Sequence, residues 1–219
     1  MVNSSSNLYK FTIKLSQNHS YISTCYHEAG HAVCGLLMFM KIPDVSVFKN
    51  RRISGETNYE VITDEQSKDP GFINFLIKSD IYINYAGLMA EKIFYQDVTG
   101  SRIFPNVLKD GVEDDIKEIA KIIKINDLAP AGRKRYLYKK KMMRETRILM
   151  EQHWDIIKIV AHELFEKKKL NHEDLKKIIC RKTSNKKFWK KQFAYIHNFV
   201  DQNKPLDSKD LKIIIPVVG

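Results

Sequence analysis

The sequence has few of the features that cross-link a small fold or anchor a chain in a membrane. Cysteine occurs three times in 219 residues, at positions 25, 34 and 180, and an odd, scattered set argues against a disulfide framework. The longest apolar run, residues 32–40, is about half as long as a membrane-spanning helix. The first 17 residues contain no apolar core of a secretory signal. These absences predict no transmembrane segment and a location in the cytoplasm or another reducing intracellular compartment.

Nucleotide- and nucleic-acid-binding patterns are also missing. The chain contains no G-x-x-x-x-G-K-[ST] phosphate loop, zinc-finger spacing or helix-turn-helix pattern. Positive charge, in contrast, is abundant: the net charge is +11, and segments 133–147 and 167–191 hold eight and eleven Lys or Arg residues. Such segments form either solvated faces of helices or surfaces for an anionic partner. Without a recognition motif, we do not expect nucleic acid to be a partner.

Apolar periodicity predicts a mainly α, multihelical fold with a small β-hairpin or sheet. We expect helices over residues 20–40, 71–95, 112–126, 133–152, 154–168 and 172–181. Asn18 or Ser20 is the expected N-cap of the first helix, and Pro43 its stop. The alternating pattern of residues 44–62 predicts a hairpin, and residues 96–111 a loop. The predicted organisation is a lead-in at 1–19, one domain at 20–181, and a basic extension at 182–219 with a helix near 186–200 and a strand at 211–219.

The most informative short pattern is HEAGH, residues 27–31, inside the first predicted helix. Side chains at i and i+4 lie on one face of a helix, so His27 and His31 can direct their rings at one metal ion. Glu28 lies beside that point, where it can take a proton from a metal-activated water. A chain of this composition contains roughly 0.01 such patterns by chance. Gly30 predicts close approach of another backbone, and two buried structural histidines remain the alternative.

A third ligand must come from another segment, and helical phase favours Asp115. In the predicted helix after Gly111, Asp115 falls within the apolar arc, whereas Glu113 and Asp114 point away from it. A carboxylate directed into a core is costly unless it is paired or binds a metal. Asp115 is therefore the candidate third ligand, with a buried and capped carboxylate as the alternative. Glu91 competes for the same role; alternatively, it lies behind a ligand and orients it, or makes a purely structural polar contact.

Residues 27–32, HEAGHA, resemble the zinc-site helix of FtsH-type ATP-dependent metalloproteases. Residues 86–94 (AGLMAEKIF), 111–123 (GVEDDIKEIAKII) and 145–179 are similar, in the same order, to later segments of that family's peptidase domain. The segment RRISGET, residues 51–57, is similar to its strand and turn. The resemblance covers about residues 20–180. It implies an FtsH peptidase-domain-like fold, a Zn²⁺ ion held by His27, His31 and Asp115, and Glu28 as the catalytic base.

The chain also departs from the family. Leu88 and Lys92 stand where the family has Arg and a second Glu, and the ATPase module is missing. The resemblance therefore predicts a zinc metalloendopeptidase without its own ATPase, which hydrolyses unfolded or loosely folded proteins. Protein or peptide substrates would be its partners; a homo-oligomer and a separate ATPase partner stay open. The alternative function is a non-catalytic peptidase-like adaptor that binds proteins or anionic partners through its basic C-terminal half.

Overall fold

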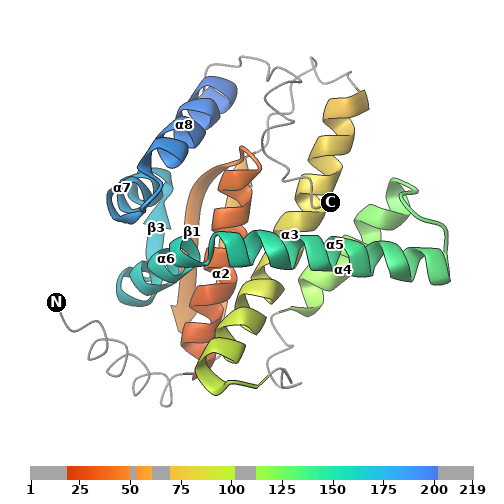
Figure 1. Ribbon diagram of the computed structural model, residues 1–219, viewed down its shortest axis with the longest axis horizontal. Coiled ribbons are helices and arrows are strands. Elements are labelled where there is room, and N and C mark those ends of the chain that lie inside the picture. The colour runs from red at the N-terminus through yellow and green to blue at the C-terminus, as the bar shows by residue number, and fades with distance from the viewer. Residues whose placement is uncertain (1–18, 50–52, 61–69, 102–111, 202–219) are drawn as a thin grey trace.

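The computed structural model describes residues 19–49, 53–60, 70–101 and 112–201. These residues form a mainly helical fold with one small antiparallel sheet, as the periodicity predicts (Figure 1). The predicted lead-in, most of the loop before residue 112 and the predicted strand at 211–219 lie outside the described residues. Among the described residues, no helix is both long and apolar enough to cross a membrane.

Two helices, α2 (His19–Leu37) and α3 (Pro70–Thr99), cross at the centre of the molecule. Nearly all side chains of α2 are buried, and in α3 the buried side chains are mainly those of residues 79–94. At the crossing, a Cβ on Gly30 would lie 2.6 Å from the Ala86 carbonyl oxygen and 2.8 Å from the Ala90 Cβ. Only glycine fits there, which confirms the close backbone approach predicted for Gly30.

The end of α2 differs from the prediction. The helix ends at Leu37 in a Schellman motif, in which the Met40 amide donates to the Gly35 carbonyl (2.9 Å) and Phe39 has a left-handed φ of 60°. Pro43 is therefore not the helix stop; it lies inside the following strand. Ser20 lies within α2 and is not its N-cap. The apolar run to Met40 misled the prediction, because the turn residues are buried as deeply as the helix.

The sheet lies against α2. Strands β1 (Lys41–Lys49) and β2 (Ile53–Glu60) form the predicted antiparallel hairpin. A third strand, β3 (Lys169–Asn171), was not predicted; it pairs with the other edge of β1 and gives the order β2-β1-β3. Its three residues are too few to show a period of two. Strand β2 is an edge strand within the described part of the sheet.

Helix α3 is longer than predicted, and residues 96–99 are helical rather than loop. Contacts with distant residues stabilise this last turn: Arg147 donates to the Gln96 side chain (3.0 Å), and Trp154 donates to Asp97 (2.7 Å). Gly100, with a φ of 67°, ends the helix. Local propensity could not reveal these contacts.

The remaining helices follow the prediction within one or two residues. They are α4 (Glu113–Ile125), α5 (Arg133–Gln152), α6 (Trp154–Lys167) and α7 (His172–Lys182), followed by α8 (Lys186–Ile196) and the π-helical turn η2 (His197–Asp201). Helix α8 was predicted as part of a basic extension. It buries Trp189 and Phe193, and the Gln192 side chain donates to the Leu36 carbonyl at the end of α2 (2.7 Å). Residues 186–196 thus pack on the same core as α2.

Candidate metal centre

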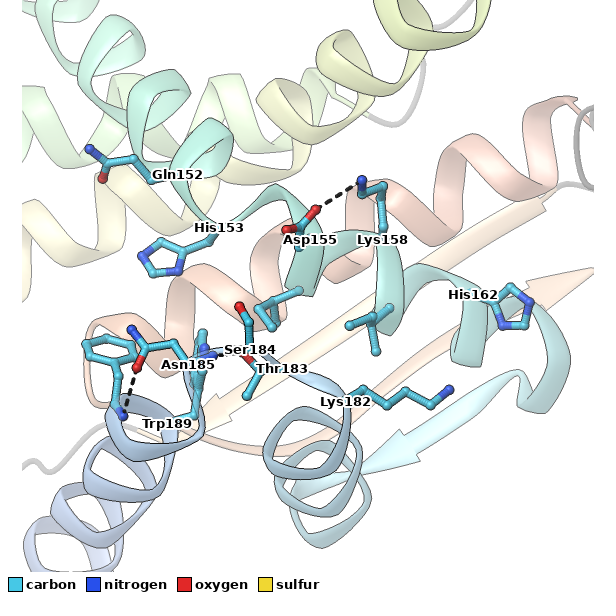
Figure 2. A pocket seen from close by; sticks show the side chains of 13 residues that line it. Gln152, His153, Asp155, Lys158, His162, Lys182, Thr183, Ser184, Asn185 and Trp189 are labelled. Atoms are coloured by element: carbon cyan, nitrogen blue, oxygen red, sulfur yellow. Dashed lines mark hydrogen bonds and ion pairs between the residues drawn. The ribbon is translucent and has the colours of Figure 1, made fainter. Parts of the chain in front are cut away.

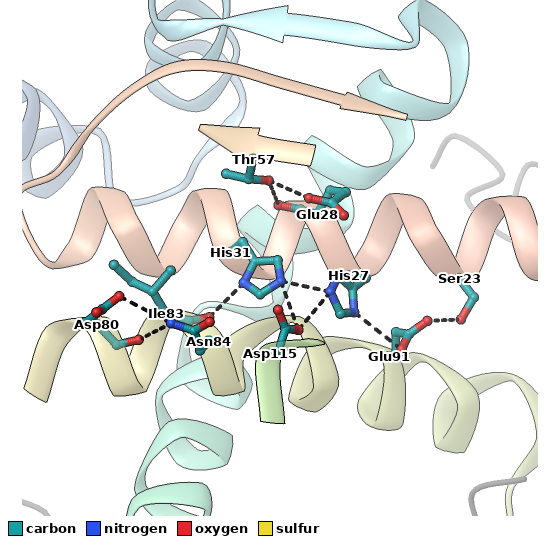
Figure 3. A network of polar contacts seen from close by, with 10 residues as sticks. All are labelled: Ser23, His27, Glu28, His31, Thr57, Asp80, Ile83, Asn84, Glu91 and Asp115. Carbon is teal, nitrogen blue, oxygen red and sulfur yellow. Dashed lines mark hydrogen bonds and ion pairs between the residues drawn. The ribbon is translucent and has the colours of Figure 1, made fainter. Parts of the chain in front are cut away.

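Three side chains from two helices converge beside the α2–α3 crossing (Figure 3). His27 and His31 lie one turn apart on α2, with their Nε2 atoms 2.8 Å apart. The Oδ2 atom of Asp115, on α4, lies 3.2 Å from the His27 Nε2 and 3.4 Å from the His31 Nε2. Ligand atoms on one tetrahedral zinc ion are about 3.3 Å apart, given bonds of about 2.0–2.1 Å. The three atoms therefore already have nearly the spacing that a shared metal ion requires.

The Asp115 carboxylate is where helical phase predicted it. Its side chain is 19% exposed, whereas the neighbouring Asp114 side chain is 91% exposed and pairs with Lys117 in solvent. The Asp115 Oδ2 atom is fully buried and has no hydrogen-bond donor aligned with it. A buried, unsatisfied oxygen facing two imidazole nitrogens fits a cation, because a metal would satisfy all three atoms.

The close approach of these side chains also shifts the pKa values of His27 and Asp115. Burial lowers the pKa of His27, but the adjacent carboxylates of Asp115 and Glu91 and the nearby charge of Glu28 together raise it well above its ordinary value. Burial raises the pKa of Asp115, and the two histidines more than reverse this and hold it below its usual range. The pocket thus favours a positive charge between the three side chains, which is the charge a divalent metal supplies.

Helix α3 orients both rings from behind. The His31 Nδ1 lies 2.7 Å from the Ile83 carbonyl oxygen and can only donate to it. The His27 Nδ1 faces the Glu91 Oε2 at 3.4 Å, and the Ser23 hydroxyl donates to the Glu91 Oε1 (2.8 Å). A proton on each Nδ1 leaves each Nε2 lone pair directed at the metal position. Of the roles considered for Glu91, the structure places it behind a histidine, on the side away from Asp115 (Figure 3).

Gly87 is a site residue that the sequence analysis did not identify. A Cβ there would lie 2.5 Å from the His31 Nε2 and 2.6 Å from the His27 Nε2. The metal-facing edges of both rings therefore lie against bare backbone of α3. A signal was available, because a glycine inside a long buried helix costs about 1 kcal/mol relative to alanine and needs a packing reason.

Glu28 points the other way, toward strand β2 (Figure 3). Its Oε2 accepts a hydrogen bond from the Thr57 hydroxyl (2.7 Å), and its side chain lies directly against Gly55, where a Cβ would collide with it. Glu28 is thus buried between the histidine helix and the edge strand. The family resemblance of residues 51–57 pointed to this strand, but the contacts of Gly55 and Thr57 with Glu28 depend on tertiary packing and were not predicted.

The cysteines do not join the centre. Cys25 and Cys34 are fully buried, and burial raises the pKa of the Cys25 thiol to about 12. Thiols in such surroundings stay protonated and serve as packing residues. The ligand set at the triad is therefore two nitrogens and one oxygen.

A separate pocket of about 760 Å³ lies between α6 and the α7–α8 connection (Figure 2). Its lysines are already paired: Lys158 with Asp155 (3.1 Å) and Lys182 with Glu163 (2.6 Å). Its histidine His153 has a pKa lowered by burial and stacks on Phe188. The pocket shares no residue with the triad and provides no comparable convergence of ligand atoms.

Comparison of the chain with protein-family models and with curated protein sequences gives no match. The function of the protein is therefore inferred from the geometry of the triad and from the motif resemblance.

Proposed function

We propose that the protein is a zinc-dependent metalloendopeptidase with an FtsH peptidase-domain-like fold, which cleaves unfolded or loosely folded proteins. The observation that supports this most directly is the convergence of His27, His31 and Asp115, whose ligand atoms all lie within 4.8 Å of one another. Three protein ligands are typical of catalytic zinc, because a fourth position stays open for water or substrate. Two nitrogens and a carboxylate oxygen form a common ligand set for this ion.

Each residue has a distinct task in this mechanism. His27, His31 and Asp115 would hold the zinc, which when bound activates a water molecule and polarises the peptide carbonyl. Glu28 would be the base that takes a proton from the attacking water and returns it to the leaving amine. In the structure its carboxylate is directed toward β2, so this role requires it to turn toward the histidines. The Thr57 hydroxyl fixes the Oε2 atom of Glu28. The other oxygen, Oε1, packs directly against Gly55, where a Cβ would collide with it.

Strand β2 provides the substrate-binding edge in this proposal. It pairs with β1 along one edge only, within the described part of the sheet, and it contacts Glu28 through Gly55 and Thr57. An extended peptide can add to such an edge by main-chain hydrogen bonds. A stably folded domain rarely exposes a strand, so it would resist cleavage unless a separate ATPase partner unfolds it.

The test is cleavage of casein by the zinc-loaded chain and by its Glu28→Gln variant. The amide keeps the shape of the carboxylate but cannot accept a proton, so cleavage should fall by a factor of about 10² to 10⁴ while zinc content is unchanged. Glu113→Gln, an exposed acid on α4 and outside the proposed substrate-binding strand, is the matched control and should cleave normally. Undiminished cleavage by Glu28→Gln would refute the mechanism. A wild-type chain that binds zinc and cleaves nothing would favour the non-catalytic adaptor.

A further inference from the structure

The junction of α4 and α5 exposes large apolar side chains that the core does not use. Ile125 ends α4 and is 70% exposed, while Tyr136 and Leu137 in the first turns of α5 are 62% and 51% exposed. Figure 1 shows this junction at the edge of the molecule, far from α7 and α8. Scattered single apolar residues on a surface need no explanation, but three within residues 125–137, at the junction of two helices, indicate a contact surface.

Exposed basic side chains lie on the same helix as Tyr136 and Leu137. Arg133, Lys140 and Arg144 are all exposed, and none lies within ion-pair distance of a carboxylate in the described part of the chain. Together with Leu137 they follow the spacing i, i+4, i+7 and i+11, which places them on one face of α5. The opposite face is buried through Met142, Thr146, Leu149 and Met150. We call Ile125, Arg133, Tyr136, Leu137, Lys140 and Arg144 the α4–α5 tip.

The chemistry of the α4–α5 tip selects among partners. A second copy of this basic surface would be repelled by like charge. Nucleic acid would pair with the cations but would leave two exposed aliphatic side chains without a function. An anionic lipid surface uses both properties, because its headgroups attract Lys and Arg while apolar side chains enter the boundary between headgroups and acyl chains.

Helix α8 provides an internal comparison. Lys186, Lys187 and Lys190 are exposed on it, so its charge matches that of the tip. Its large apolar side chains Trp189 and Phe193 are instead buried in the core. Charge without exposed apolar surface is what a solvated helix face requires. The α4–α5 tip therefore differs from α8 in having exposed large apolar side chains, which insertion into lipid requires.

We propose that the α4–α5 tip docks the protein on an anionic lipid surface. The three basic residues provide the electrostatic attraction, and Ile125, Tyr136 and Leu137 insert at the level of the headgroups. The inference does not depend on the proposed peptidase activity, because no residue of the tip belongs to the metal centre.

The experiment is co-sedimentation of the full chain with vesicles of phosphatidylcholine, alone or mixed with phosphatidylserine. We expect binding only to the mixed vesicles, with an affinity that decreases as salt increases. The triple variant Arg133→Gln, Lys140→Gln, Arg144→Gln should weaken binding on the order of a hundredfold, since each cation near the surface contributes about fivefold. The double variant Ile125→Ser, Leu137→Ser, with unchanged charge, should weaken it by roughly tenfold or more.

The matched control is the triple variant Lys186→Gln, Lys187→Gln, Lys190→Gln, which removes the same charge from α8. It should lower binding less than threefold, roughly the effect of net charge alone. Equal losses in the two triple variants would overturn the proposal, because net charge would then explain the binding. Absence of binding to the mixed vesicles would also overturn it. A third result would also overturn the proposal: polyglutamate displaces the protein from vesicles, and the double variant binds vesicles with undiminished affinity. An acidic protein would then be the better partner.

Discussion

Helices α2 and α4 both supply ligands to the candidate metal centre, but they are embedded in the fold to very different degrees. Helix α2 is enclosed by α3, α6, the sheet and α8, and nearly all of its side chains from Tyr21 onward are buried. Helix α4 packs mainly on α3 and buries only Ile119, Ile122 and Ile123. The histidines are therefore fixed by the core itself, whereas the position of Asp115 depends on one smaller interface.

This difference suggests how the centre is built. The ring orientations of His27 and His31 are set before any metal binds, by the Ile83 carbonyl and by Glu91. Asp115 must be brought to them by the docking of α4. A metal ion would link the two helices across 84 residues of chain and so stabilise the weaker interface. Substitutions around the metal centre and removal of the metal test this unequal division.

Asp115→Asn should weaken metal binding by a factor on the order of a thousand, because the amide loses the charge that balances the cation. Asp114→Asn on the same helix is the control and should change the affinity less than threefold, since its side chain lies in solvent. Metal titration with a competing chelator measures both. Equal affinities would rule out α4 as a source of a ligand. A site emptied by Glu91→Gln instead would make Glu91 the third ligand.

Removal of the metal should destabilise the protein unequally. At a metal concentration about a hundredfold above Kd, binding adds about 2.7 kcal/mol to the free energy of unfolding, and a chelator would remove it. Hydrogen exchange should show lost protection of α4 amides, while α2 and α3 amides stay protected. Uniform loss of protection over all three helices would contradict the view that the core fixes the histidines while the position of Asp115 depends on the docking of α4.

Gly87→Ala should disturb the two histidines, which the core otherwise holds in place. The added methyl group would lie within 2.6 Å of both Nε2 atoms, so the rings must shift; we expect a loss of about 2 kcal/mol in stability and a lower metal content. The control is Gly35→Ala in α2, whose Cβ would lie 2.8 Å from the Cδ1 atom of the buried Ile42, so it disturbs packing without contact to the rings and should keep the metal content. Thermal unfolding and elemental analysis compare the two. Unchanged metal content in Gly87→Ala would show that the rings tolerate displacement.

Glu91→Gln should have the smallest effect of the series. The amide keeps its contact with Ser23 but loses the charge facing the His27 Nδ1, so metal affinity should fall by about tenfold. Glu113→Gln, an exposed acid on α4, is the control and should leave the affinity unchanged. Equal affinities of the two variants would show that the Ile83 carbonyl and the core packing suffice to orient the rings.

Local periodicity was enough to predict the parts of the fold that are periodic. Residues 113–125 have a clear apolar face, and the same face placed Asp115 correctly beside the histidines. Apolar periodicity could not predict where α2 ends, because Met38, Phe39 and Met40 are as buried in a turn as they would be in a helix. Strand β3 is three residues long and forms only because β1 is present.

The metal-facing side chains were predictable, and their surroundings were not. The i, i+4 spacing of His27 and His31 is a local property of one helix. The contact of Gly87 with both rings, and that of Thr57 with Glu28, exist only after α3 and β2 pack against α2. Sequence patterns could indicate a close approach at Gly30, but they could not say which residues would approach.

The separation of the ligands along the chain also affects when the site exists during synthesis. A growing chain contains His27 and His31 well before Asp115, since 84 residues separate His31 from Asp115. At translation rates of about 5–20 residues per second, this interval lasts roughly 4–17 s. Two imidazoles on one helix hold a metal far more weakly than the full triad. If the protein has the peptidase activity proposed above, it would stay inactive while its own chain is unfolded on the ribosome, and would become active only after α4 has docked and its own strands are protected from cleavage.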